Sequence, residues 1–112
     1  MEKRATPPSS TFDLIAHLHD QRSFSDQVFG PGQRTAGVLD HIRKELKEIE
    51  ADPADLMEWT DLLLLAFDGA MRRGHSPEAI AQALAQKLAI NKTRTWPDWR
   101  SLPLDKAIEH LD

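Results

Sequence analysis

The 112-residue sequence contains no cysteine. Without thiols the chain can form neither a disulfide nor a zinc site held by thiolates, and this composition fits the reducing cytoplasm. It also has no run of about 18 apolar residues, the length that predicts a membrane-spanning helix. Residues 1–10 carry basic residues with no apolar stretch behind them, so they do not resemble a signal peptide. Their polar composition, ending in prolines and serines, predicts a disordered tail.

An excess of positive charge is also missing. Asp and Glu outnumber Lys and Arg by 18 to 14, which gives a net charge of −4. Sequence-independent binding to nucleic acid needs Lys and Arg to neutralise phosphates, so this balance argues against it. Hydrophobic residues make up 40% of the chain, enough for one modest core. We therefore expect a single domain over residues 11–112 that binds neither a nucleic-acid polymer nor a membrane. The net charge does not argue against binding a small phosphorylated molecule through a few local basic groups.

Helical periodicity fills the segments between clear breaks. Proline and glycine mark those breaks at 29–32, 52–53 and 74–77, and a Trp-Pro-Asp-Trp stretch follows at 96–99. The first helix should begin at Thr11 and either end near Arg22 or continue to Val28. The others are expected at three ranges: 35–50, 53–73 and 77–94. The pattern predicts an all-α fold, an antiparallel bundle of four main helices plus a short C-terminal helix at 104–111.

Two acidic pairs lie in the second and third expected helices, Glu45 with Glu48 and Glu58 with Asp61. The spacing of three residues puts both carboxylates of a pair on one side of its helix, about one turn apart. Two unit charges about 4 Å apart repel by about 4 kcal/mol at an effective dielectric constant of about 20. A hard divalent cation such as Mg²⁺ removes this repulsion by binding oxygen ligands. The pairs therefore predict a metal site.

The position of these acids on their helices separates them from ordinary surface acids. On a wheel of about 100° per residue, Glu45 falls beside Val38, and Glu48 lies at the edge of the same apolar stripe. The pair in the third helix likewise shares a side with Leu65. Uncompensated charge is unfavourable on a core-facing side. Either pair alone is explained by a solvated helix surface, but two pairs on consecutive helices favour the metal site.

The fourth expected helix carries the complementary groups. Lys87, Asn91 and Arg94 share its apolar face with Ile80 and Leu84. In a compact bundle these side chains would lie near the acids and bind phosphate oxygens, although they could instead extend to solvent or cap the helix end. Acids, a divalent metal and basic groups together are the arrangement of a site that cleaves phosphoanhydrides.

Two further candidates flank the break at 29–32. Its two glycines around a proline predict a tight turn that allows close approach of the backbone to another group. Arg34, just after the turn, is a candidate phosphate ligand. Phe24, just before it, is a candidate for stacking on a base, although an aromatic residue near a helix is more often part of the core. Asp68 either extends the acidic side of its helix or pairs with Arg72.

The spacing of the acids resembles a known signature. Glu45-x-x-Glu48 followed by Glu58-x-x-Asp61 is similar to the ExxE…ExxD metal motif of the MazG-like all-α NTP pyrophosphohydrolase superfamily. A lone ExxE motif has little specificity, but the doubled motif followed by a Lys, Asn and Arg helix is much more specific. The resemblance therefore involves the same acidic residues whose spacing predicts a metal site.

Closer similarity is seen to the dATP/dGTP diphosphohydrolase group, which includes phage-encoded MazZ-type enzymes. Phe-Gly-Pro-Gly-x-Arg at 29–34 and Trp-Pro-Asp-Trp-Arg at 96–100 resemble segments of that group, and the likeness extends over roughly residues 12–111. The sequence departs from the group at Phe24, where many relatives have tryptophan. It departs again at Leu88, where glutamine is frequent. A change at position 24 puts the preference among purines in doubt if that residue contacts the base.

The resemblance implies metal-dependent hydrolysis of a purine (deoxy)nucleoside triphosphate, dGTP or dATP, to the monophosphate and pyrophosphate. For MazZ-type enzymes this reaction controls phage or bacterial nucleotide pools in the 2-aminoadenine genome pathway. It implies four ligands for two or more Mg²⁺ ions, with Mn²⁺ as a substitute: Glu45, Glu48, Glu58 and Asp61. It also implies three residues near the phosphates: Lys87, Asn91 and Arg94.

We expect Glu48, helped by Glu45, to orient and deprotonate the attacking water. One open, acid-lined face lacks a wall for a nucleotide, so we also expect a homodimer or a homotetramer built as a dimer of dimers. Two alternatives stay open: a pyrimidine (dCTP or dUTP) pyrophosphatase, which would differ in its base pocket, and a non-catalytic helical module whose acids bind a basic partner. For a phage-encoded enzyme, the expected location is the host cytoplasm.

Overall fold

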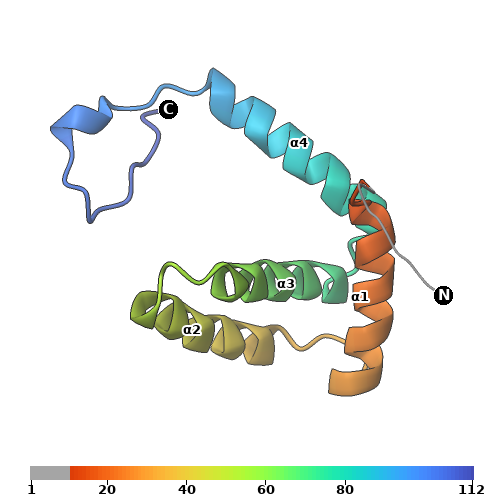
Figure 1. The fold of residues 1–112 in the computed structure, drawn as a ribbon. Helices are drawn as coiled ribbons and strands as arrows, with labels where there is room; N and C mark the ends of the chain where they lie inside the picture. The colour runs from red at the N-terminus through yellow and green to blue at the C-terminus, as the bar shows by residue number, and fades with distance from the viewer. Residues whose placement is uncertain (1–10) are drawn as a thin grey trace. The chain divides into compact units, whose positions relative to one another are not determined.

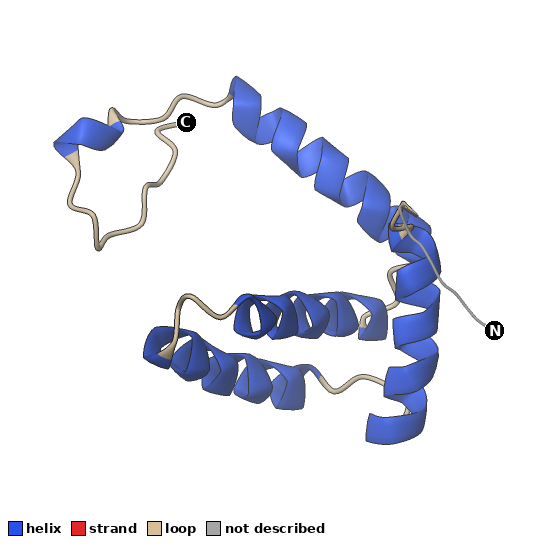
Figure 2. Ribbon diagram, in the orientation of Figure 1, coloured by secondary structure: helices blue, strands red, loops and turns tan. Residues whose placement is uncertain are grey.

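The computed structural model describes residues 11–112, and every regular element in that range is helical (Figures 1 and 2). The elements are four α-helices and one 3-10 helix: α1 (Leu14–Phe29), α2 (Thr35–Ala51), α3 (Leu56–Arg72), α4 (Pro77–Thr93) and η1 (Trp99–Ser101). The all-α prediction is confirmed. The expected disordered tail at 1–10 lies outside the described residues. Over residues 11–112 no helix has the length and apolar character needed to cross a membrane.

Two helices begin later than the sequence predicts. α1 begins after Asp13, whose carboxylate accepts a hydrogen bond from the backbone N–H of Ala16 at 3.1 Å, and not at Thr11. α3 begins after Asp55, because a turn comes first in which the N–H of Asp55 donates to the carbonyl of Asp52 at 3.2 Å. Threonine and aspartate are both good N-cap residues, so the local sequence alone does not select between Thr11 and Asp13 or between Asp52 and Asp55.

The start of α4 and the end of α3 follow their sequence signals. Ser76 caps α4, with Pro77 at the first helical position, and its Oγ accepts a hydrogen bond from the N–H of Ala79 at 3.1 Å. Gly74 adopts φ +99° just after α3, a conformation that terminates a helix and favours glycine. α1 continues to Phe29, slightly beyond the longer of the two predicted ends.

The chain divides into two compact units, one ending at Ala81 and the other spanning Gln82–Asp112. In the first unit α2 and α3 lie side by side and antiparallel, and α1 packs against α3 (Figure 1). Leu18 and Met71 form its buried centre together with Ile80. α2 and α3 approach closely at Gly69, where an added Cβ would lie 3.2 Å from Val38 Cγ1. This close pairing brings the acidic stretches of α2 and α3 together.

In the second unit the predicted C-terminal helix at 104–111 is not formed, and that prediction was wrong. The residues after α4 form a loop closed by the N–H of Leu111, which donates to the carbonyl of Thr95 at 2.8 Å. The one regular element of this loop is η1. Leu104 and Leu111 are exposed, and so short a helix is unstable without packing to compensate the entropy of its first turn.

Candidate active site

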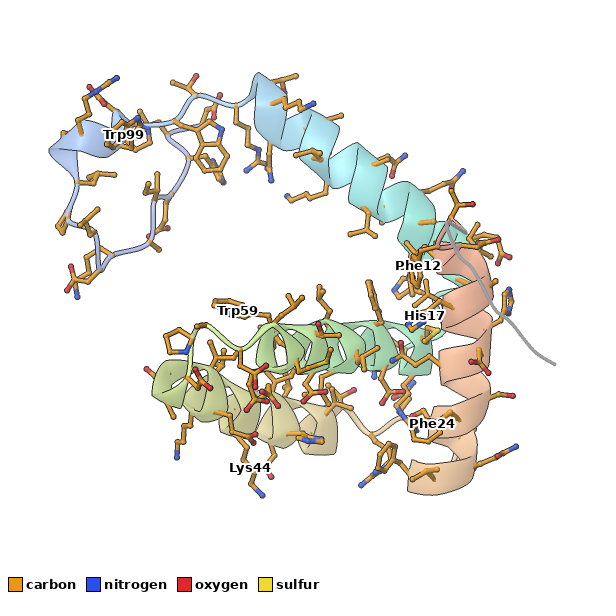
Figure 3. All side chains as sticks on the ribbon, viewed as in Figure 1. Phe12, His17, Phe24, Lys44, Trp59 and Trp99 are labelled. Carbon is orange, nitrogen blue, oxygen red and sulfur yellow. The ribbon has the colours of Figure 1, made fainter. Side chains whose placement is uncertain are left out.

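Three of the four predicted metal ligands meet between α2 and α3. One carboxylate oxygen from each of Glu45, Glu48 and Glu58 lies within 4.8 Å of the other two. The first two project from α2 and the third from the first turn of α3, and oxygen atoms gather between these helices in Figure 3. The antiparallel pairing explains the meeting, because the end of α2 lies beside the start of α3. We refer to these three residues as the acidic cluster.

The environment of the acidic cluster disfavours negative charge. Glu45 is only 3% exposed, and its Oε2 has no hydrogen-bond partner. Desolvation, the hydrogen bond to Glu45 and the charges of the neighbouring acids, in that order of importance, together raise the pKa of Glu58 to about 7. A buried oxygen without a partner and a carboxyl that holds its proton near neutral pH both indicate a missing positive charge. A divalent cation with oxygen ligands would supply it.

Asp61, the fourth predicted ligand, lies one turn beyond Glu58 on α3 and is exposed. It is not one of the three residues whose oxygens converge within 4.8 Å. It lines the pocket described next, together with Glu45. The four predicted ligands are thus divided into the acidic cluster of three and Asp61 on the pocket wall. The role of Asp61 as a metal ligand stays a prediction.

A pocket of about 290 Å³ opens between α1, α2 and α3 beside the acidic cluster. Glu45 and Asp61 contribute its carboxylates. Phe24 and Phe29 also line it, with ring centroids 6.1 Å apart and planes at 85°, an edge-to-face pair. We refer to the part of the pocket lined by these two rings as its aromatic end. Carboxylates and aromatic rings in one pocket suit a ligand that combines a metal-binding group with a flat apolar one.

The two candidates beside the turn at 29–32 both line this pocket. Phe24 is 57% exposed, so its ring is not part of the buried core, which was the structural alternative. Arg34 is also exposed, and its Nη1 donates to the carbonyl of Phe29 at 3.2 Å. The structure therefore places a stacking candidate and a basic candidate in one pocket with the acids.

Sequence reasoning missed two polar residues of α1 that line the pocket. Gln21 donates from Nε2 to the carbonyl of Leu64 at 2.8 Å, which ties α1 to α3. Ser25 is a polar residue only 3% exposed. The spacing offered a signal, because Gln21 lies three residues before Phe24 and four before Ser25, and residues three and four apart on a helix share a face. That face was not identified as a pocket wall because polar residues are common on exposed helices.

Residues 17–112, which include the acidic cluster and the whole pocket, match a model of the dATP/dGTP pyrophosphohydrolase family. The chain belongs to this family. The resemblance inferred from the doubled acidic motif is thereby confirmed.

Two relatives of this family member extend the comparison. It is similar to the Eaa protein of Salmonella phage P22, with 42% identity over 94 residues, which are 84% of this chain and 29% of that protein. The chain thus spans less than a third of the length of this relative. It is also similar to the solved MazG-like pyrophosphohydrolase of cyanophage S-2L, with a TM-score of 0.67 and 27% identity over 88% of this chain and 97% of that one. That protein was solved bound to dGDP and three catalytic Mn²⁺ ions per active site. The MazG-like fold is confirmed.

The predicted phosphate ligands of the fourth helix belong to the second unit. Lys87 is exposed on α4, whereas Asn91 and Arg94 are partly buried. The guanidinium of Arg94 contacts the imidazole of His110, and Nε1 of Trp96 donates to the carbonyl of Asn91 at 2.8 Å. The C-terminal loop thus engages the end of α4 where two of these residues lie. Their binding to phosphate stays a prediction.

Proposed function

We propose that this family member hydrolyses a purine (deoxy)nucleoside triphosphate, dGTP or dATP, to the monophosphate and pyrophosphate in a divalent metal-dependent reaction. The observation that carries the proposal is the convergence of three carboxylates beside a pocket that also contains two aromatic rings. The cyanophage relative supports it, since that protein was solved with dGDP and three catalytic Mn²⁺ ions. The purine preference follows from the family and from this relative, because rings that stack on purines also stack on pyrimidines.

The residues of the site fit two or more Mg²⁺ ions, for which Mn²⁺ substitutes. Four carboxylates would hold them: Glu45, Glu48, Glu58 and Asp61. When bound, divalent cations at this site would lower the pKa of a coordinated water and offset the negative charge of the triphosphate. The orphaned Oε2 of the buried Glu45 is the feature of this chain that most directly calls for such a ligand.

The protein's own residues divide the remaining tasks. Glu45 is buried and held by the packing of α2, whereas Glu48 is exposed and reaches solvent. We therefore assign to Glu48 the orientation and deprotonation of the attacking water. Phe24 stacks on the base at the aromatic end of the pocket. Four basic or amide side chains bind phosphate oxygens: Arg34, Lys87, Asn91 and Arg94.

A homodimer or homotetramer is the proposed assembly. No residue of the second unit, all of which the structure describes, belongs to the buried apolar set. It exposes large apolar residues instead, among them Leu88 and Trp99. An apolar groove of about 360 Å³, lined by Leu39 and Ile42 of α2, also lies open in the first unit. A second copy would cover such surface; a monomeric mass at assay concentration would contradict this assembly.

A substrate panel tests the activity. The common ribo- and deoxyribonucleoside triphosphates should be incubated with Mg²⁺ or Mn²⁺, and the products resolved as monophosphate plus pyrophosphate or diphosphate plus phosphate. Fastest pyrophosphate release from dGTP or dATP supports the proposal. A clear preference for dCTP or dUTP would assign a pyrimidine enzyme, and no pyrophosphate from any nucleotide would leave a non-catalytic module.

The proposed setting is the cytoplasm of a bacterium, or of the host for a phage-encoded chain. The similarity to proteins of two phages supports the phage alternative. There the reaction would remove dATP and supply dGMP to the 2-aminoadenine genome pathway. Expression in bacteria should then lower the cellular dATP pool, whereas expression of the Glu45→Gln variant should leave that pool unchanged.

A further inference from the structure

A buried arginine joins three elements at the far end of α3. The side chain of Arg72 is only 4% exposed, and its Nε donates to Oδ2 of Asp68 at 2.9 Å. Its Nη1 donates to the carbonyls of Gly30 and Gly32 at 2.9 and 2.8 Å. Its Nη2 donates to Oγ of Ser25 at 2.8 Å and to the Ser25 carbonyl at 3.3 Å. One guanidinium thus ties α1 and the turn after it to α3.

The hydrogen bonds around this arginine form a closed network. Ser25 Oγ donates in turn to Oδ1 of Asp68 at 2.7 Å, so the carboxylate accepts from both the serine and the arginine. The turn contains Gly30 and Gly32 at φ of +88° and +91°, and because glycine is conformationally free, hydrogen bonds from outside the turn help to fix this one conformation. Only a planar group with donors on three nitrogens reaches a carboxylate, a hydroxyl and three carbonyls together.

The groups held by this network form one wall of the pocket. Ser25 and Asp68 both line it, as do Phe29 before the turn and Arg34 after it, whereas Arg72 does not. Arg72 lies fourteen residues beyond Glu58 in the numbering, which is about 20 Å along the axis of α3 at about 1.5 Å per residue. The network therefore shapes the aromatic end and is remote from the acidic cluster.

We propose that Arg72 is a positioning residue for nucleotide binding, which fixes Ser25 and the turn at 29–32 against α3 and thereby sets the places of Phe29 and Arg34 in the pocket. The inference rests on the proposed function. A wall that is already ordered before binding does not have to be ordered by the ligand, which strengthens binding. Because the acidic cluster is remote, loss of the network should weaken nucleotide binding and leave the chemical step and metal binding intact.

The test compares Arg72→Lys with a matched control, Arg73→Lys. Lysine keeps the charge at position 72 but cannot reproduce the planar set of donors. Arg73 is the exposed neighbour, and its Nη1 donates only to the side chain of Gln33. Each variant should be assayed for KM and kcat on the best substrate, for Mn²⁺ affinity by calorimetry, and for thermal unfolding.

Arg72→Lys should raise KM by about tenfold or more, with kcat and Mn²⁺ affinity within about twofold of the parent protein. Arg73→Lys should match the parent in all three. A folded Arg72→Lys variant with the parent KM, or with a loss of kcat at unchanged KM, would overturn the inference. If Arg72→Lys does not fold, Ser25→Ala replaces it, because it removes one member of the network; an unchanged KM there also overturns the inference.

Failure of the proposed function can be distinguished from failure of the positioning role of Arg72. If the parent protein cleaves no nucleotide, the activity is refuted, and binding of dGDP in the presence of Mn²⁺ is measured by calorimetry instead. Weaker binding of dGDP to Arg72→Lys than to the parent supports the positioning role. Equal binding, or no binding to the parent protein, overturns it.

Discussion

Replacing Glu45 with glutamine should stabilise the metal-free protein and destabilise the metal-loaded one. Glu45 is 3% exposed and its Oε2 has no partner, a condition that costs the folded state about 1–3 kcal/mol. Glutamine removes the charge and offers an N–H₂ group that can donate to the adjacent carboxylates of Glu48 and Glu58. We therefore expect a gain of about 1–3 kcal/mol in the free energy of unfolding without metal. For a domain near this size each kcal/mol raises Tm by about 4–8 °C.

With metal the order should reverse. A ligand at about 1,000 times its Kd stabilises the folded state by about 4.1 kcal/mol, which exceeds the gain of about 1–3 kcal/mol expected for the metal-free variant. The parent protein receives this stabilisation from Mn²⁺, whereas Glu45→Gln has lost the buried ligand atom that lacks any other partner. Turnover should fall to background for the same reason, because the metal ions are no longer held.

The assay is thermal unfolding followed by circular dichroism in a chelator and in excess Mn²⁺, together with pyrophosphate release. Glu50→Gln is the matched control, since it makes the same change in charge at an exposed position of α2. Glu50→Gln should change neither Tm nor the rate of turnover. A lower Tm of Glu45→Gln in chelator, undiminished stabilisation by Mn²⁺, or turnover above a few per cent of the parent would each refute the reasoning.

Three further predictions concern single residues. The pKa of Glu58 is raised from 4.5 to about 7, so between these pH values the folded metal-free protein binds a proton that the unfolded chain has lost. The free energy of unfolding should therefore fall as the pH rises from 4.5 to 7. Glu58→Gln or added Mn²⁺ should flatten this pH profile in thermal unfolding. Gly30→Ala should lower the free energy of unfolding, measured in urea, by about 1–3 kcal/mol, because φ +88° and ψ 160° suit glycine alone. Gly37→Ala should instead raise the free energy of unfolding by up to about 1 kcal/mol, because Gly37 lies inside α2 and an added Cβ would meet only the flexible end of Arg34. Asp61→Asn should abolish turnover and metal-dependent nucleotide binding together, without a change in Tm in chelator, since its side chain is exposed; activity above a few per cent would remove Asp61 from the site.

Local patterns were sufficient for the existence of the four main helices and for the identity of the key acids. The start of α4 at Ser76-Pro77 and the end of α3 near Gly74 were predicted, because caps and breaks act within one turn of the chain. The burial of Glu45 also followed from the wheel, since helical periodicity shows which side chains share the apolar face. The doubled acidic spacing then indicated the family, and the family implied the purine.

Packing decided which of these groups meet. The spacing treats Glu58 and Asp61 alike, but only Glu58 joins Glu45 and Glu48, because the antiparallel contact of α2 and α3 sets which turn of α3 faces the acids. The late start of α3 and the missing helix at 104–111 have the same origin. Competing caps and short helices are selected by their surroundings, which the local pattern does not contain.

The hydrogen-bond network of Arg72 shows most clearly which contacts local sequence patterns cannot predict. The pairing with Asp68 was accessible from the sequence, because residues four apart on a helix are neighbours. The bonds to Ser25 and to the turn carbonyls at Gly30 and Gly32 join positions at least 40 residues apart. Local sequence thus specified the helices and the chemistry of the acids. The tertiary fold chose their partners, because a side chain's long-range contacts depend on how whole helices pack and not on its near neighbours in the chain.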